Sequence, residues 1–294
     1  MPCKLILVPL SGHHNSAYTK SLELAALQAA FRLGQAWRVR VRVLLIDAPS
    51  TDDYKPLAPW MPAHGLEKVL GILVEADRRR RRDALQAFEA MVEQFSAQLA
   101  PEDAAAGFAV ELVEVSGNVP ELLAAQGKLA DLIVVAYPPP GRSSSTPLKL
   151  EVALRETGRP VLVAPVTPFK TVAEHVAVAW NGSREAARAV AMSLDLLRSS
   201  NRVSIVSVQE GGTIEPSAQQ LAEYLAVHSI EASPIVLEES ERNAGARLLA
   251  ECERTGADLL LMGAYTRSRT RQLIFGGATS HVLKEATIPV VMVE

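Results

Sequence analysis

The sequence predicts an α/β protein built from two doubly wound, open parallel-sheet domains in tandem. Short runs of apolar, often β-branched residues alternate with longer helical patterns along the chain. Such alternation is typical of a parallel sheet with helices on both faces, joined by right-handed crossovers. The pattern occurs twice in the 294 residues, with five apolar runs in each copy. A chain of this length can form two domains of ordinary size.

The first copy is expected at residues 1–168, and its first run, KLILVPLSG, is followed by the helical pattern SLELAALQAAFRLG. The five predicted strands are Lys4–Gly12, Val41–Pro49, Val110–Val115, Asp131–Tyr137 and Arg159–Val166. Gly12 matches Gly182 at an offset of 170, whereas Asp131 matches Asp258 at an offset of 127, so this copy has about 43 extra residues. Most of this insertion, at about 50–90, is a proline-rich loop and a long helical pattern from about Leu66 to Leu99.

The second copy is expected at residues 169–294 and follows a short junction near Thr167–Glu174. Its predicted strands are His175–Ser183, Arg202–Gln209, Ser233–Glu239, Asp258–Tyr265 and Ile288–Val293. Helical patterns such as REAARAVAMSLDLL and AGARLLAECERTG separate them. Because the junction is short, the two domains are expected to be in contact. Each copy ends in an apolar run that would leave an unpaired sheet edge. We therefore expect the two final strands to pair within one chain, in a pseudo-twofold arrangement.

Composition limits the classes of partner. The formal net charge of −3 gives no support for a nucleic-acid-binding surface. No apolar stretch approaches the roughly 20 residues that span a bilayer, and the first apolar run is too short for a signal peptide. Two cysteines make no disulfide framework and suggest a reducing, cytoplasmic location. Arg78–Arg82 would wrap around a whole helix, so we interpret this run as solvated or salt-bridged.

The stretch Asp258–Glu294 carries the strongest functional signal. An apolar run ends in Gly263, a basic loop follows, and Gly276 and Gly277 precede an amphipathic stretch and a last apolar run. This order predicts strand, loop, glycine turn, helix and strand. A glycine turn at a helix start can hold an anion, because its backbone N–H groups are unpaired and the helix dipole is positive there.

These residues resemble the nucleotide loop of the universal stress protein family, commonly Gly, two residues, Gly, nine residues, Gly and then Ser or Thr. Gly263 takes the first place and Gly276 the third. Thr266 stands where the second glycine belongs, and Gly277 stands where Ser or Thr belongs. A β-branched threonine does not easily adopt φ > 0, so the loop is expected to bend differently here. The lost hydroxyl at 277 removes one donor, although the N–H of Gly277 remains.

The resemblance implies domains of the adenine nucleotide α-hydrolase-like fold and a site for ATP or another adenine nucleotide in the C-terminal copy. In the family pattern, the residue at Asn181 contacts the nucleoside and the backbone at Val208 meets the adenine edge. The implied site residues end three strands, line the phosphates or could replace the lost hydroxyl: Asn181, Gly182, Val208, Met262, Gly263, Arg267, Gly276, Gly277, Ala278 and Thr279. Two other interpretations stay open: Asn181–Ser183 as a turn and N-cap, and the loop arginines as solvated.

The N-terminal copy is expected to have a degenerate site. Pro138–Pro140 remove three N–H donors after its fourth strand, and no glycine pair precedes the next helix. Thr146 and Pro147 read as an ordinary N-cap and first helical residue, and Ser11 stands where the family has Asp. We expect this copy not to bind a nucleotide.

We expect a stress-response regulatory protein that binds an adenine nucleotide and is not an enzyme. No GxxxxGK[ST], GxGxxG, CxxC or HExxH motif is present, so neither catalytic residues nor metal ligands are assigned. Glu210 and Glu285 are the carboxylates nearest to the loop in sequence, and neither is well suited to hold Mg²⁺. A nucleotide-free scaffold and, with less support, an ATPase remain as alternatives. The protein partner is open, and the insertion could support a homodimer.

Overall fold

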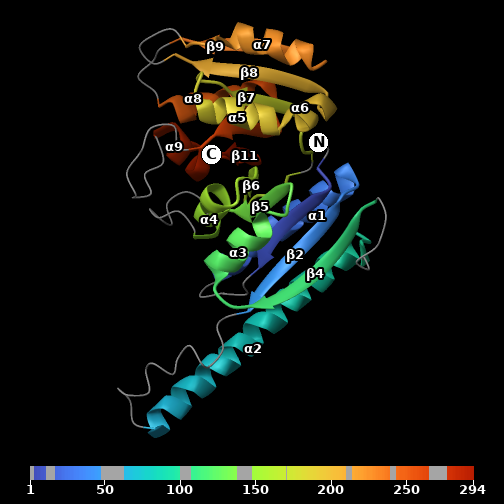
Figure 1. The fold of residues 1–294 in the computed structure, drawn as a ribbon, viewed down its shortest axis with the longest axis vertical. Helices are drawn as coiled ribbons and strands as arrows, with labels where there is room; N and C mark the ends of the chain where they lie inside the picture. Colours follow the sequence, from blue (N-terminus) through green and yellow to red (C-terminus); the bar gives the residue numbers. More distant parts are fainter. Residues whose placement is uncertain are drawn as a thin grey trace.

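A computed structural model describes residues 3–10, 17–47, 63–99, 107–137, 148–169, 171–209, 214–238, 243–264 and 277–294. These residues form one eleven-stranded sheet with the order β3-β4-β2-β1-β5-β6-β11-β10-β7-β8-β9 (Figure 1). All strand pairs are parallel except β6 with β11. The predicted α/β fold in two tandem, doubly wound copies is confirmed.

The N-terminal half contributes six strands and four helices. The strands are β1 (Leu5–Leu10), β2 (Arg40–Asp47), β3 (Gln98–Leu99), β4 (Ala109–Ser116), β5 (Leu132–Ala136) and β6 (Val161–Ala164). The helices are α1 (Ala17–Trp37), α2 (Ala63–Gln94), α3 (Val119–Gly127) and α4 (Leu148–Glu156). Strand β3 was not predicted. The helical pattern expected to continue to Leu99 ends at Gln94, where a turn reverses the chain and Ser96 adopts φ +48°.

The C-terminal half contributes five strands and five helices. The strands are β7 (His175–Ala179), β8 (Arg202–Val208), β9 (Ala232–Leu237), β10 (Leu259–Gly263) and β11 (Val290–Val293). The helices are α5 (Arg184–Met192), α6 (Leu194–Ser199), α7 (Ala218–Val227), α8 (Ala244–Thr255) and α9 (Gly277–Glu285). Apart from β3, the strand order of one half repeats that of the other, from third strand to second, first, fourth and fifth.

The two halves meet through their last strands. Strands β6 and β11 pair antiparallel, with Val163 opposite Val290, Leu162 opposite Val291 and Val161 opposite Met292. Their residues are buried, so the junction belongs to the sheet interior rather than to a surface contact. The expected pairing of the two final strands within one chain is confirmed. The sheet therefore has a pseudo-twofold axis through this junction, and the strands of one half run opposite to those of the other.

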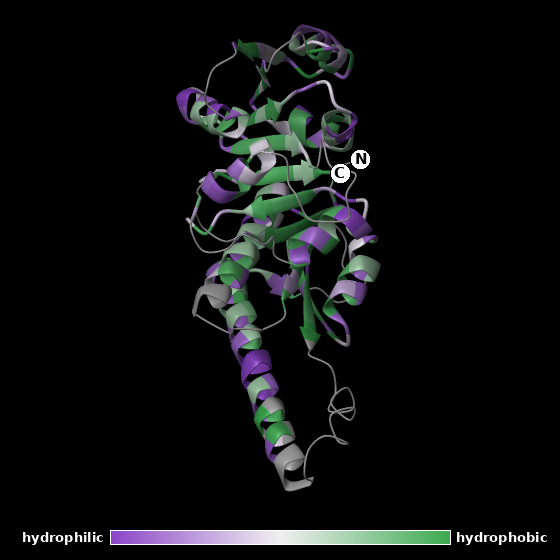
Figure 2. Cartoon of the chain, turned by 90° about the vertical axis from the view of Figure 1, so that its left-hand side faces the viewer, coloured by the Kyte–Doolittle hydropathy of each residue, from purple (hydrophilic) through white to green (hydrophobic). Residues whose placement is uncertain are grey.

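Helices cover both faces of the sheet and enclose two apolar cores. Residues of α1, α2, α5, α6 and α7 pack on one face, and residues of α3, α4, α8 and α9 pack on the other. In the N-terminal half, an aromatic cluster anchors the first core: the ring of Phe31 lies 5.8–6.1 Å from those of Phe88, Phe95 and Phe108. Figure 2 shows the strands as a mainly hydrophobic layer in the middle of the molecule.

Helix α2 is the longest element and extends well beyond the body of the molecule (Figures 1 and 2). The arginine run lies where the helix joins the body. Arg81 forms two hydrogen bonds with Glu114 of β4, and Arg80 pairs with Asp77. These contacts agree with the salt-bridged interpretation of the run. In the part of the chain that the structure describes, no helix has the length and apolar character needed to cross a bilayer.

Candidate functional site at the carboxyl edge of the C-terminal half

The strand order of the C-terminal half reverses between β7 and β10. In open α/β sheets, a ligand crevice forms at the carboxyl ends of the strands at such a point. Asn181 and Gly182 follow β7, Val208 ends β8, and Met262 and Gly263 end β10. The structure therefore brings these five predicted site residues to one edge of the sheet.

Gly263 is needed for close packing. A β-carbon at this position would lie 2.6 Å from the backbone nitrogen of Ala186 and 2.7 Å from the carbonyl carbon of Glu185. Both belong to the first turn of α5, so the helix can approach the end of β10 only because residue 263 has no side chain. The first glycine of the family pattern thus brings the N-terminus of α5 to the crevice.

Asn181 and Gly182 form the turn from β7 into α5. The Asn181 Oδ1 atom accepts a hydrogen bond from the N–H of Ser183 at 3.1 Å, and Ser183 caps α5 by accepting from Ala186 N–H at 3.2 Å. Gly182 has φ +69°, where a β-carbon would lie 2.5 Å from the carbonyl oxygen of Glu215. The turn and N-cap interpretation therefore describes this segment, and the oxygen assigned to a nucleoside contact is already engaged.

Trp180 and Ser207 shape the edge, and the sequence reasoning did not single them out. The buried indole of Trp180 donates a hydrogen bond to the carbonyl oxygen of Pro216 at 2.7 Å, which fixes the chain after β8 over the end of β7. The hydroxyl of Ser207 donates to the carbonyl oxygen of Trp180 at 2.8 Å. A serine hydroxyl among the apolar residues at the end of a predicted strand is the signal that could have revealed this contact, because a buried hydroxyl needs a hydrogen-bond partner.

Val208 turns its backbone toward the crevice. The N–H of Gln209 donates to the carbonyl oxygen of Leu237 at 3.0 Å, so the backbone groups of Gln209 face β9. The backbone N–H and C=O of the preceding residue, Val208, consequently point away from β9, toward the place beyond the end of β7. The Trp180 carbonyl, which a longer β7 would offer to this N–H, is occupied by Ser207. Val208 thus presents one donor and one acceptor side by side at the edge.

The first turns of α8 and α9 pack against each other on the same edge. A β-carbon at Gly245 of α8 would lie 2.5 Å from the carbonyl oxygen of Ala278 in α9. Gly277 is exposed, Ala278 is half-buried and Thr279 is buried. The predicted site residues Arg267 and Gly276 lie outside the described residues, as do Thr266 and the other loop arginines.

The matching edge of the N-terminal half is closed by an ion pair. Lys149, the second residue of α4, corresponds to Ala278, the second residue of α9. Its ammonium group lies 2.5 Å from Glu23 Oε1 of α1 and 3.4 Å from the carbonyl oxygen of Pro9 in β1. The pair connects helices from opposite faces of the sheet across the end of β1. The expected degeneracy of the N-terminal site stays a prediction.

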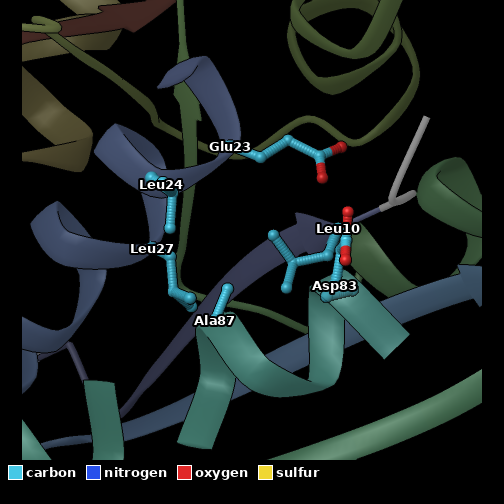
Figure 3. A pocket seen from close by; sticks show the side chains of 7 residues that line it. Leu10, Glu23, Leu24, Leu27, Asp83 and Ala87 are labelled. Atoms are coloured by element: carbon cyan, nitrogen blue, oxygen red, sulfur yellow. The ribbon is translucent and has the colours of Figure 1, made fainter. Parts of the chain in front are cut away.

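A small pocket lies beside this ion pair (Figure 3). Its apolar wall comes from β1, α1 and α2, and the carboxyl groups of Glu23 and Asp83 lie on one side of it. The lining residues are Leu10, Glu23, Leu24, Leu27, Asp83, Ala84 and Ala87. Because two carboxylates lie at this pocket, it is poorly suited to a phosphate.

The described residues contain few reactive groups. Burial raises the pKa of Cys252 to about 12, and burial together with Asp131 raises the pKa of Cys3 to about 12, so neither thiol forms a thiolate near neutral pH. Across the described ranges, no group of three or more His, Cys, Asp or Glu residues is placed to hold a metal ion.

Comparison with known proteins connects this arrangement to a family. The model of the universal stress protein family matches residues 173–294. A universal stress protein from Archaeoglobus fulgidus DSM 4304 superposes with a TM-score of 0.64 at 16 % identity, covering 100 % of this chain and 99 % of that chain. A protein from Pseudomonas aeruginosa UCBPP-PA14 superposes with a TM-score of 0.56 at 13 % identity, covering 99 % of this chain and 93 % of that chain.

A functionally unknown protein from Pseudomonas aeruginosa PAO1 gives a TM-score of 0.53 at 12 % identity, covering 99 % of this chain and 92 % of that chain. No curated protein matches the sequence. The solved structures thus share the fold over the full length of the chain, including both copies of the repeat. Residues 173–294 thus match the universal stress protein family, and the solved structures share the two-copy fold of the whole chain.

Proposed function

We propose that the protein is a stress-response regulatory protein that binds one adenine nucleotide, at the carboxyl edge of its C-terminal half. The observation that carries this proposal is the orientation of Val208. Its N–H and C=O lie side by side, beyond the end of β7. The Watson–Crick edge of adenine offers the complementary pair, an acceptor at N1 and a donor at N6. Guanine has the opposite arrangement at that edge, so the backbone would select adenine.

The phosphate groups would lie toward the N-terminus of α9. The backbone N–H groups of Gly277 and Ala278 are in the first turn of this helix, where they have no partner within the helix. The helix dipole favours negative charge at this end. Adenine at Val208 and phosphate at α9 place the ribose over the ends of β7 and β10, between Gly182 and Gly263.

We propose binding rather than catalysis as the activity, in the cytoplasm. Among the described residues, none of the carboxylates near the edge is arranged as a general base with an orienting partner. Glu185, the one packed beside Gly263, is paired with Arg184 at 3.1 Å. Regulation would then consist of a different affinity for protein partners in the nucleotide-bound and nucleotide-free forms.

A nucleotide-free interaction scaffold is the second candidate. The observation that favours it is the contact network around Gly182: Asn181 Oδ1 is engaged in the turn, and the Glu215 carbonyl lies directly against Gly182. In such a scaffold the edge would be filled by its own chain, and interactions would depend on other surfaces.

Nucleotide analysis separates the two candidates. Freshly purified protein would be denatured and its supernatant examined by anion-exchange chromatography for AMP, ADP and ATP. Titration calorimetry of nucleotide-stripped protein with ATP and with GTP would then measure selectivity. We expect binding of ATP at one site per chain and at least about tenfold weaker binding of GTP, because the single Val208 backbone pair cannot match guanine. No co-purified nucleotide and no heat of binding with ATP would support the scaffold instead.

A further inference from the structure

The inference begins with two equivalent residues, one at the end of β1 and one directly after β7. The pairing of β1 with β5 has the same register as the pairing of β7 with β10, and it makes Ile6 equivalent to Val176. Four residues further along, Leu10 therefore corresponds to Trp180. Both side chains are buried on the same face of the sheet. The two halves thus place side chains of very different size at the same position of the fold.

The larger of the two side chains fills its position. The indole of Trp180 is 5 % exposed and donates a hydrogen bond to the carbonyl oxygen of Pro216, so the chain after β8 closes over it. Leucine is smaller than tryptophan, and in the N-terminal half a small pocket lies beside Leu10, between α1 and α2 (Figure 3). Because protein interiors are close-packed, a space that one half fills and the other leaves open is a place to look for a ligand.

The pocket has an apolar wall. Leucine and alanine side chains from the end of β1, from α1 and from α2 form it: Leu10, Leu24, Leu27, Ala84 and Ala87. Leu10, Leu27 and Ala84 are at most 3 % exposed, so this wall is part of the core. Sites for small molecules typically combine such a wall with a few polar groups that fix the orientation of the ligand.

The charged groups at the pocket leave one carboxylate uncompensated. Glu23 is 9 % exposed, and its Oε1 atom lies 2.5 Å from the ammonium group of Lys149. Asp83 is half-buried and forms no ion pair or hydrogen bond with the other described residues. The arginines two to four positions before it in α2 pair with other carboxylates. Because the ammonium group neutralises only one of the two carboxylates, a ligand with a single positive charge matches the pocket.

Lys149 shows how this edge of the sheet receives an alkylammonium group. Its Nζ atom pairs with Glu23 and lies 3.4 Å from the carbonyl oxygen of Pro9, the residue before Leu10. A free alkylamine has the same two parts as this side chain, a positive end that donates hydrogen bonds and an apolar stem. It would present the positive end to Asp83 and the stem to the leucines of the wall.

We propose that the pocket between β1, α1 and α2 binds a small primary alkylamine with one positive charge. The ammonium group donates hydrogen bonds to the carboxylate of Asp83, and the alkyl chain packs on the leucine and alanine side chains of the wall. Such an amine is protonated at neutral pH, as the side chain of lysine is. Because the pocket is small, the ligand is a short aliphatic amine rather than a ring system. The inference does not depend on the proposed nucleotide site, which belongs to the other half of the sheet.

Three probes of nearly the same shape separate charge from packing. They are isoamylamine, the neutral isoamyl alcohol and the anion isovalerate, which share a branched alkyl chain. Each would be titrated into the whole chain with isotope-labelled leucine methyl groups, and NMR would follow the methyl signals. We expect the amine to shift the signals of Leu10, Leu24 and Leu27. The alcohol should bind at least about tenfold more weakly and the anion not at all, because only the ammonium forms a charge-assisted hydrogen bond with Asp83.

Two variants test the two parts of the site. Asp83→Asn keeps the shape of the side chain without its charge, so it should bind isoamylamine about tenfold more weakly while its affinity for isoamyl alcohol changes by less than about twofold. Leu10→Trp should fill the pocket as Trp180 fills its own position, and should abolish binding of both compounds. Glu89→Gln is the matched control, because it removes one negative charge from an exposed position of the same helix, outside the pocket. Thermal melts check that each variant is folded.

Each other outcome overturns a specific part of the proposal. Equal affinities of the wild type for the amine and the alcohol would show that the pocket does not select a cation. Equal losses in Asp83→Asn and Glu89→Gln would mean that the overall charge attracts the amine. Undiminished binding to a folded Leu10→Trp variant would place the ligand outside the pocket; if that variant does not fold, the leucine methyl shifts decide the location. The absence of any shift with the amine would refute the site and leave the proposed function unaffected.

Discussion

Asp131 and Asp258 occupy equivalent places in the two halves of the sheet and make the same contacts. The carboxylate of Asp131 accepts hydrogen bonds from the N–H groups of Lys4 and Leu5 at 2.9 and 3.0 Å. That of Asp258 accepts from Glu174 and His175 at 3.2 and 2.9 Å. Asp131 directly precedes β5 and fixes the start of β1, and Asp258 directly precedes β10 and fixes the start of β7. The internal repeat therefore extends to individual hydrogen bonds.

Replacement of Asp258 by alanine should destabilise the C-terminal half. Two backbone N–H groups at the start of β7 would lose their acceptor, which we expect to cost about 1–3 kcal/mol of unfolding free energy. Urea denaturation followed by circular dichroism measures the change. Glu253→Ala is a suitable control, because its exposed side chain makes no contact of this kind. An equal effect of both substitutions would contradict the role of the Asp258 carboxylate.

The buried imidazole of His175 should make stability depend on pH. Its Nε2 atom lies 2.8 Å from the hydroxyl of Ser204, and burial, with a contribution from Arg202, lowers its pKa below the ordinary value of 6.5. As the pH drops below about 6.5, the imidazole becomes protonated in the unfolded chain before it does so in the folded protein. The free energy of unfolding should therefore fall in this range.

Urea denaturation at several pH values between 5 and 8 would measure this slope. In His175→Gln the slope should decrease, because the titrating group is gone while a polar side chain still faces Ser204. The interpretation would not survive a variant whose stability changes with pH as steeply as that of the wild type.

The antiparallel junction predicts which cysteine pair can form a disulfide. Leu162 and Val291 lie directly opposite each other and are both buried in the same core. Cysteines at these two positions, in a background without Cys3 and Cys252, should form a bond within one chain, since opposite residues have the required Cα separation. Non-reducing gels and mass spectrometry would detect it. Cysteines at Ala164 and Met292 are a control, because Met292 lies opposite Val161 and these two positions should form no disulfide. If the cysteines at 162 and 291 formed only intermolecular disulfides, two chains would be exchanging these strands.

Gly263→Ala should reduce stability even without a ligand. The added methyl group would meet the backbone of Ala186 and Glu185, which cannot move without displacing α5, and we expect a loss of about 1–3 kcal/mol. Gly71→Ala in α2 is the control, because no atom lies within 4 Å of its would-be β-carbon. Thermal melting of the two variants would test the prediction. Equal melting temperatures would show that residue 263 tolerates a side chain.

The sequence predicted the fold well because the fold depends on features that repeat. Alternating apolar runs and helical patterns, present twice, predicted two doubly wound copies, and the apolar run at the end of each copy predicted the pairing of the final strands. Short-range geometry was harder to predict. The turn at Phe95 and Ser96 ends α2 and leads into β3. It depends on a single residue, Ser96, in the left-handed region, and the hydrophobic pattern of the helix does not predict such a conformation.

The candidate site was predicted only where its residues follow strands. Gly182, Val208 and Gly263 could be placed from the strand ends, although Gly263 acts mainly by admitting α5 to the edge. Trp180 and Ser207 were not predicted, because their contacts come from residues distant in sequence. The indole of Trp180 donates a hydrogen bond to a carbonyl 36 residues away, and the hydroxyl of Ser207 donates to the carbonyl of Trp180. Such contacts follow from packing rather than from spacing in a motif.

The antiparallel pairing of β6 and β11 also gives the molecule two separate ends. Because the strands of the two halves run in opposite directions, their carboxyl edges point away from each other. Helix α2, which begins after the carboxyl end of β2, extends from the edge opposite to the C-terminal site. A small molecule at one end and a protein at the other could therefore bind simultaneously without steric competition. Strands β6 and β11 are the part of the sheet that connects these two ends.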